Sequence, residues 1–305
     1  MSCSPKTAPS RPRSSLWTES RSTAISERVT DDALRQSTEI VRTRDPDRYL
    51  ADLFAPAELR PHLLYLHAFA FEVADIRGRV SDPTLGEIRL KWWEGALRGD
   101  HGGAPLARAL HETIERFRLP LSAFDRVLEA RVFDLYDDPM PSLNDLEGYA
   151  GDTESAVMQL GAMILAGGRD SGTAELAGLA GVAVALTGLL RALPRNVARG
   201  QSFIPADMLT AQGGLAGSGT ADAAELMRAA AADLRRRAQQ RLVEARVAQS
   251  GMAEALLPAF LPAAMVPAYL GRMERAGFDP LRDSADVSPF RRQWVIWRAA
   301  RAGRF

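Results

Sequence analysis

Apolar residues recur every three or four positions along nearly the whole chain, and no other feature limits its fold as strongly. Windows rich in Ala, Leu, Arg and Glu place apolar side chains at i, i+3, i+4 and i+7, and residues 59–73 are one such window. This spacing gives an α-helix one apolar face, whereas the strict alternation typical of half-buried strands is almost absent. The sequence therefore predicts an all-α protein.

Capping residues, prolines and glycines predict where the helices begin and end. Ser81-Asp82-Pro83 combines an N-cap candidate with a proline for the first turn, and the glycines after residue 98 would end the helix that follows. Other helices are expected from residues 31 and 56 onward and over 104–118, 121–136, 142–166, 172–191, 221–248 and 289–302. The longest apolar stretch, 255–270, is interrupted by three prolines and is shorter than the ~20 residues of a membrane span. It is predicted to be a buried helix or a pair of short ones.

Composition and charge exclude several classes of protein. The 305 residues carry 38 basic and 38 acidic side chains, so bulk electrostatics do not favour nucleic-acid binding. Residues 1–18 contribute +3 and residues 291–305 contribute +5, which leaves an acidic body of −8 over 19–290. Cys3 is the only cysteine, so the chain has neither an intramolecular disulfide nor a cysteine-based zinc cluster. This cysteine usage is typical of a reducing compartment.

The amino-terminal segment differs in composition from the rest. Residues 1–18 are rich in Arg and Ser and lack acids, as in an organellar transit peptide, but three prolines oppose the amphipathic helix of such a peptide. We therefore favour a disordered tail over residues 1–28. Residues 29–305 are predicted to form one helical domain.

Two segments of the chain resemble signatures of the squalene/phytoene synthase superfamily. Residues 47–80 contain Tyr49-Leu50-Ala51, the LFAP step at 53–56 and Ala68-Phe69. Residues 181–209 contain Leu190-Arg191 and the RGQSFIP step at 199–205. The resemblance runs from about residue 31 to 302 and implies the isoprenoid synthase fold, a single helical domain around a central cavity. Four residues are candidates for the cavity wall: Tyr49, Phe69, Glu154 and Phe203.

The sequence departs from this family where the family binds metal. An active synthase holds Mg²⁺ with carboxylates on facing helices, and the metal neutralises the departing diphosphate. Here the first motif reads ADIRG at 74–78 and keeps only Asp75, and the second reads ALPRN at 192–196 and keeps no acid. Each lost charge is worth ~1–4 kcal/mol at ~4 Å. We therefore expect no metal and no cofactor, and we expect Pro194 to kink or end its helix.

The charged residues that remain at these motifs allow two interpretations each. Glu72 and Asp75 share a helical face and are either a remnant cation or headgroup site or partners of nearby arginines, and we favour the pairing. Arg191, Arg195 and Arg199 recur every four residues beside Asn196. They form either a metal-free binding stripe for a diphosphate or phospholipid headgroup, or an ordinary solvated face.

The last helix also allows two interpretations. Phe290, Trp294 and Trp297 lie along one side of segment 290–302, with arginines around them. Such a helix can lie on an anionic membrane or dock on a partner, or it can pack its aromatics on the domain, which is the interpretation we favour.

Residues 189–194 and 203–207 resemble most closely a non-catalytic branch of the superfamily, which includes the mitochondrial respiratory complex I assembly factor and its bacterial relatives. That resemblance implies a role in complex I assembly, with respiratory-complex subunits as partners and a lipid or isoprenoid in the cavity. It also implies a cytoplasmic protein at the inner membrane, or a mitochondrial matrix protein in a eukaryote. The first alternative is an active head-to-head prenyltransferase that uses Asp75 and Mg²⁺. The second is an interaction module with a closed cavity.

Overall fold

The computed structural model describes residues 31–211 and 220–305, and every regular element within these ranges is a helix. The predicted tail over residues 1–28 lies outside the described residues. The elements are a helix over 31–44, α2 (Pro46–Asp52), α3 (Arg60–Ala74), α4 (Ile76–Arg79), α5 (Pro83–Leu97), α6 (Pro105–Phe117), α7 (Leu121–Val132), η1 (Phe133–Leu135), α8 (Leu143–Ala150), η2 (Gly151–Ser155), α9 (Ala156–Leu165), α10 (Ala174–Ala198), α11 (Ala206–Ala211), α12 (Thr220–Ala248), η3 (Glu254–Ala259), η4 (Leu261–Met265), α13 (Val266–Met273) and α14 (Pro289–Ala302). The all-α prediction is confirmed.

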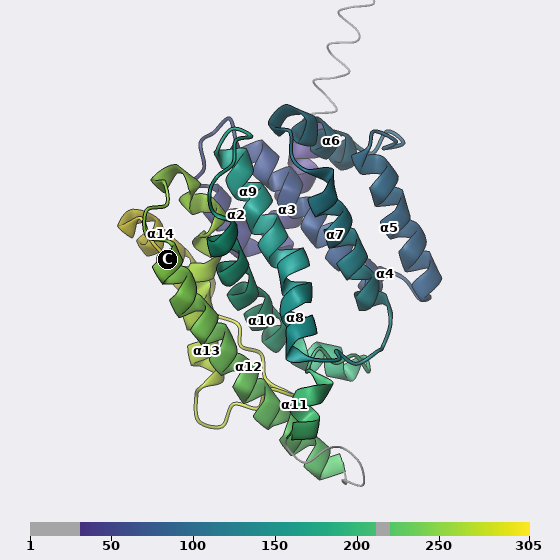
Figure 1. Cartoon of the computed structure of the whole chain (residues 1–305), viewed down its shortest axis with the longest axis vertical. Coiled ribbons are helices and arrows are strands. Elements are labelled where there is room, and N and C mark those ends of the chain that lie inside the picture. The colour runs from purple at the N-terminus through teal and green to yellow at the C-terminus, as the bar shows by residue number, and fades with distance from the viewer. Residues whose placement is uncertain (1–30, 212–219) are drawn as a thin grey trace, which may run out of the picture.

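The helices form one bundle around α10. Figure 1 shows α5 and α6 on one side of the molecule and α12, α13 and α14 on the other, with α3, α7, α8, α9 and α10 between them. The core contains three fully buried phenylalanines, Phe69, Phe124 and Phe260. By length and hydropathy α10 is the one described helix that could cross a membrane, but 61% of that window is buried inside the protein. It is the central helix of the packed core.

Local signals set several helix ends as predicted. α5 begins at Pro83, where Asp82 accepts a hydrogen bond of 2.8 Å from the Thr84 backbone N–H. The chain leaves this helix at Gly99, whose φ of 107° favours glycine. α14 begins after Ser288, whose hydroxyl caps the Arg291 backbone N–H, and ends at Gly303 with φ of 66°.

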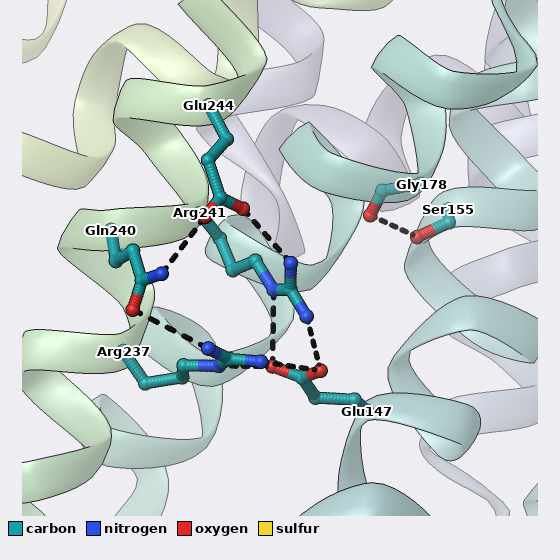
Figure 2. A network of polar contacts seen from close by, with 7 residues as sticks. All are labelled: Glu147, Ser155, Gly178, Arg237, Gln240, Arg241 and Glu244. Carbon is teal, nitrogen blue, oxygen red and sulfur yellow. Dashed lines mark hydrogen bonds and ion pairs between the residues drawn. The ribbon is translucent and has the colours of Figure 1, made fainter.

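Two arginines of α12 bind one carboxylate of α8, and this ion-pair cluster, the Glu147 clamp, ties the two helices together. The Glu147 carboxylate accepts hydrogen bonds from Arg237 (2.6 and 3.1 Å) and from Arg241 (3.1 and 2.6 Å), while Gln240 and Glu244 support the two guanidinium groups (Figure 2). Burial alone would raise the pKa of Glu147, but the hydrogen bonds and charges of the two arginines lower it to about 2. The carboxylate therefore stays ionised through the physiological pH range.

The structure corrects three expectations. Pro194 was expected to kink or end its helix, but it does not end it: α10 continues to Ala198, because buried Leu190 and Leu193 hold the turn on which the proline lies. The expected helix over 142–166 is interrupted by the π-helical turn η2. The favoured packing of the α14 aromatics on the domain is wrong as well, since all three are exposed. The stretch 255–270 is buried as predicted except at Ala255 and Pro267, and it forms η3, η4 and the start of α13.

Candidate functional site

A cavity of about 410 Å³ lies among α2, α4, α8, α10 and α13. Helix 31–44, α2 and α3 contribute residues 44–48 and 74–75 to its wall, the π turn contributes Thr153 and Glu154, and α10 contributes residues between 184 and 196. The wall is rich in charge, with eight arginines and five carboxylates. The charged residues that line the cavity are Arg44, Asp45, Asp47, Arg48, Asp75, Arg77, Arg131, Asp134, Glu154, Arg191, Arg195, Arg199 and Arg292.

Each of the five carboxylates in the wall is paired with an arginine. The buried Arg48 holds two of them, Asp45 at 3.0 Å and Glu154 at 2.5 Å. Arg131 lies 3.0 Å from Asp134. The remaining two are Asp47, 2.7 Å from Arg292, and Asp75, 2.8 Å from Arg79. Each carboxylate is neutralised by an arginine, and the wall holds eight arginines against five carboxylates. The net charge of the wall is therefore positive.

At the first motif, Arg79 binds both acids. Its guanidinium donates to Glu72 at 2.7 and 3.0 Å and to Asp75 at 2.8 Å. Glu72 does not line this cavity and faces a separate pocket beside Trp92. The pairing favoured from the sequence is thus the arrangement observed.

At the second motif, all four predicted residues line the cavity. Arg191 places its guanidinium 3.9 Å from the ring centroid of Tyr269 and donates to Asp286 at 2.9 Å. Asn196 is buried. Arg195 and Arg199 are exposed, and within the described residues no carboxylate pairs with either. These two guanidinium groups are available to an anion.

The π turn brings Glu154 into the cavity, and a glycine makes its position possible. A Cβ atom at Gly181 would lie 2.3 Å from Ser155 Oγ and 2.4 Å from Ser155 Cα, so only glycine lets α10 approach η2 this closely. The Ser155 hydroxyl donates to the Gly178 carbonyl at 3.1 Å (Figure 2). π turns inside α-helices are frequent at functional sites, where they redirect a side chain.

Sequence reasoning missed a group of three hydrogen-bonded residues in the cavity wall, Arg131, Asp134 and Tyr149, of which Asp134 is buried. Tyr149 donates to Asp134 at 2.8 Å, and Arg131 donates to Asp134 at 3.0 Å and to the Tyr149 hydroxyl at 2.5 Å. Burial raises the pKa of Asp134, and the Arg131 charge opposes that rise. No motif links these residues, since they come from α7, η1 and α8 and meet only through packing.

Two of the four residues predicted for the cavity wall are found there. Glu154 and Phe203 line the cavity, but Tyr49 and Phe69 do not. Phe69 is fully buried in the core, with ring centroids 5.1 Å from Trp93 and 5.6 Å from Phe124. Tyr49 follows three wall residues of α2, Pro46, Asp47 and Arg48, but does not line the cavity itself, because each step along a helix turns the side chain by about 100°.

Comparisons with solved structures define the class of fold. A dehydrosqualene synthase in complex with ligand superposes with a TM-score of 0.73 at 19% identity, covering 88% of this chain and 95% of that chain. A squalene synthase from Alicyclobacillus acidocaldarius superposes with a TM-score of 0.68 at 24% identity, covering 82% and 96%. The chain therefore has the isoprenoid synthase fold.

Sequence comparison places the chain within that class. The model of the squalene/phytoene synthase family matches residues 41–297, and the chain belongs to this family. NADH dehydrogenase (ubiquinone) complex I, assembly factor 6, of Rattus norvegicus is 29% identical over 247 residues, 79% of this chain and 74% of that protein. The phytoene synthase of Thermus thermophilus is 27% identical over 179 residues, 57% of this chain and 60% of that protein.

The residues at the two motifs do not fit the Mg²⁺ that the fold family implies. Magnesium requires near-octahedral oxygen ligands, usually with carboxylates among them. The second motif offers Asn196 and the guanidinium group of Arg195, and the first offers Asp75, already bound by Arg79. Within the described residues no group of three or more His, Cys, Asp or Glu side chains could hold a metal ion.

Proposed function

We propose that this chain is a non-catalytic member of its family that acts in the assembly of respiratory complex I. One observation carries the proposal: the metal-binding positions hold alanine, arginine and asparagine, and Asp75 is engaged by Arg79. Without a metal to neutralise it, a departing diphosphate loses most of its stabilisation. The assembly role is supported by the likeness to complex I assembly factors over 79% of the chain, against 57% for the phytoene synthase.

The cavity of this protein binds a phosphate-bearing lipid or prenyl compound through arginine instead of metal. Arg195 and Arg199 carry no carboxylate partner among the described residues, and Arg77 makes one ion pair, of 3.3 Å, to the half-exposed Asp137. Guanidinium groups bind phosphate oxygens in pairs of parallel hydrogen bonds, so two or three of them can replace a metal as the counter-charge. This supports a carrier or sensor role for the cavity within assembly.

A prenyltransferase assay tests the absence of catalysis. The purified full chain is incubated with farnesyl or geranylgeranyl diphosphate, Mg²⁺ and NADPH, next to an active squalene synthase, and pyrophosphate release is measured. We expect no release above the buffer background. Release that Asp75→Asn abolishes would establish the competing prenyltransferase function.

Deletion of the gene in the organism that encodes it tests the assembly role. Assembled complex I, measured on native gels by NADH dehydrogenase staining, should fall in the deletion strain and return with the wild-type gene and with Asp75→Asn. Unchanged complex I in the deletion strain would contradict the assembly role. Restoration by the wild type but not by Asp75→Asn would favour catalysis instead.

Calorimetric titration tests the arginine site. With EDTA present, the wild type should bind farnesyl diphosphate, and Arg195→Ala/Arg199→Ala should weaken binding about tenfold or more. Arg275→Ala is the matched control, because Arg275 is exposed and does not line the cavity. Equal affinity in the double variant and the wild type would refute this site.

A further inference from the structure

The carboxy-terminal helix α14 turns its largest side chains away from the protein. Phe290, Trp294 and Trp297 follow at steps of four and three residues, so they share one face, and their exposed fractions are 77%, 52% and 47%. The opposite face packs on the domain through the buried Ile296 and Ala299. The packing of α14 on the domain therefore does not use these three aromatic side chains.

The inner face of α14 is anchored firmly, so the exposure of the outer face is a property of the fold. Arg292 points inward and lies 2.7 Å from Asp47 of α2, and its side chain is only 13% exposed. The C-terminal Phe305 is buried near Phe260, and its carbonyl accepts a hydrogen bond from Arg246 of α12 at 3.0 Å. A helix held at both ends in this way presents a fixed outer surface.

The charge of this outer surface has one sign. Residues 288–305 contain five arginines and no acid, and four of these arginines remain after Arg292 is used in its ion pair. Arg291, Arg298, Arg301 and Arg304 are exposed, and no carboxylate among the described residues pairs with them. The rings of Trp294 and Trp297 stack at 5.2 Å between centroids, beside these charges.

We propose that α14 is an interfacial helix that binds an anionic phospholipid bilayer. Tryptophan prefers the headgroup level of a membrane, where its ring is buried and its N–H stays hydrogen-bonded, and flanking arginines bind the lipid phosphates. The chain's charge distribution orients the molecule, because residues 19–290 carry −8 and are repelled by the same surface that attracts residues 291–305. This charge match favours a bilayer over a protein partner, which would need a complementary acidic groove.

The position of α14 connects this surface to the cavity. Arg292 lies in the cavity wall, and the outward residues of the same helix face the membrane. A membrane-bound α14 therefore holds the cavity within one helix diameter, about 10 Å, of the lipid headgroups. The inference does not depend on the assembly role or on catalysis.

Vesicle co-sedimentation of the full chain tests the proposal. The wild type should bind phosphatidylcholine vesicles that contain phosphatidylglycerol and should not bind pure phosphatidylcholine. The bound fraction should fall about tenfold in each of two double variants, Trp294→Ala/Trp297→Ala and Arg298→Glu/Arg301→Glu. Added salt should weaken binding of the wild type. Trp92→Ala and Arg275→Glu are matched controls, since both residues are exposed elsewhere.

Several outcomes would overturn the proposal. Failure of the wild type to bind anionic vesicles would do so, and so would a tryptophan double variant that binds as well as the wild type. A third is a solution dimer that Trp294→Ala/Trp297→Ala converts to monomer without vesicle binding, because a second copy would then cover the face. Unchanged thermal unfolding of the variants excludes misfolding as the cause of any loss.

Discussion

The two halves of α10 have the same helical geometry but differ in residue type and in how tightly they pack. From Leu176 to Leu190 the helix is made of small and aliphatic residues, mostly buried, and Gly181 brings it into direct contact with the π turn η2. From Arg191 onward it carries arginines along the cavity and contains Pro194. At Gly181 the first half has no room for an added atom, whereas the second half accommodates a helix-breaking residue, Pro194. Packing density thus separates the part of one helix that maintains the fold from the part that can change its chemistry.

The largest effect is expected where the first half is tightest. Gly181→Ala would place a Cβ within 2.6 Å of three Ser155 atoms, two of them backbone atoms that cannot rotate away. Overpacking of this kind costs about 1–3 kcal/mol or more, and we expect a loss of about 3 kcal/mol in the free energy of unfolding, measured with urea.

Gly178→Ala, one turn earlier in α10, is the matched control. A Cβ there meets no atom within 4 Å, so the substitution should gain up to about 1 kcal/mol from helix propensity. Equal stability of the two variants would show that α10 and η2 separate easily, and the contrast between the halves would fail.

The second half should respond in the opposite direction. Pro194 cannot donate to the Leu190 carbonyl, and its ring crowds the preceding turn. Pro194→Ala restores that hydrogen bond, and after allowance for the greater freedom of the unfolded chain we expect a gain of about 2 kcal/mol. Thermal unfolding measures it. A destabilised variant would mean that the proline ring itself packs in the cavity wall.

The smallest effect concerns the clamp that holds α12, the helix packed along α10. The pKa of Glu147 is lowered to about 2 in the folded protein, so its contribution is complete above its ordinary pKa of 4.5 and is lost as the pH falls from 4.5 to 2. With solvent screening allowed for, we expect Glu147→Gln to cost about 1 kcal/mol at pH 7.

Urea unfolding at a series of pH values measures this effect. The difference between wild type and Glu147→Gln should shrink as the pH approaches 2, because protonation removes the same charge that the substitution removes. A constant difference across that range would show that the clamp acts through shape and not through charge. Neither result bears on Arg195 and Arg199, which take no part in this clamp.

Much of this architecture could be predicted from sequence, because its signals are local. The periodicity of apolar residues predicted the helices, and Asp82-Pro83 predicted the start of α5 correctly. Local rules failed where distant residues act. The proline rule for Pro194 did not include the packing of Leu190 and Leu193, and the amphipathic pattern of α14 did not say which face would be covered.

The candidate site shows the same division. The four second-motif residues were predicted from their positions in a resemblance, and they line the cavity. Phe69 belonged to the same resemblance but lies in the core, because its place depends on how α3 packs on Trp93 and Phe124. Arg48 was not predicted, since its partner Glu154 is 106 residues away in the chain.

The sequence by itself determined the class of fold and the inventory of charged residues. The fold class and the charge inventory depend on residue identity and on spacing within one helix, and both identity and spacing can be read directly from the sequence. Only the tertiary structure decided which charges neutralise one another, which arginines are left over at the cavity, and that the α14 tryptophans face outward. Those outcomes depend on which helices pack together, and a hydrogen bond or a buried face exists only once two distant segments meet.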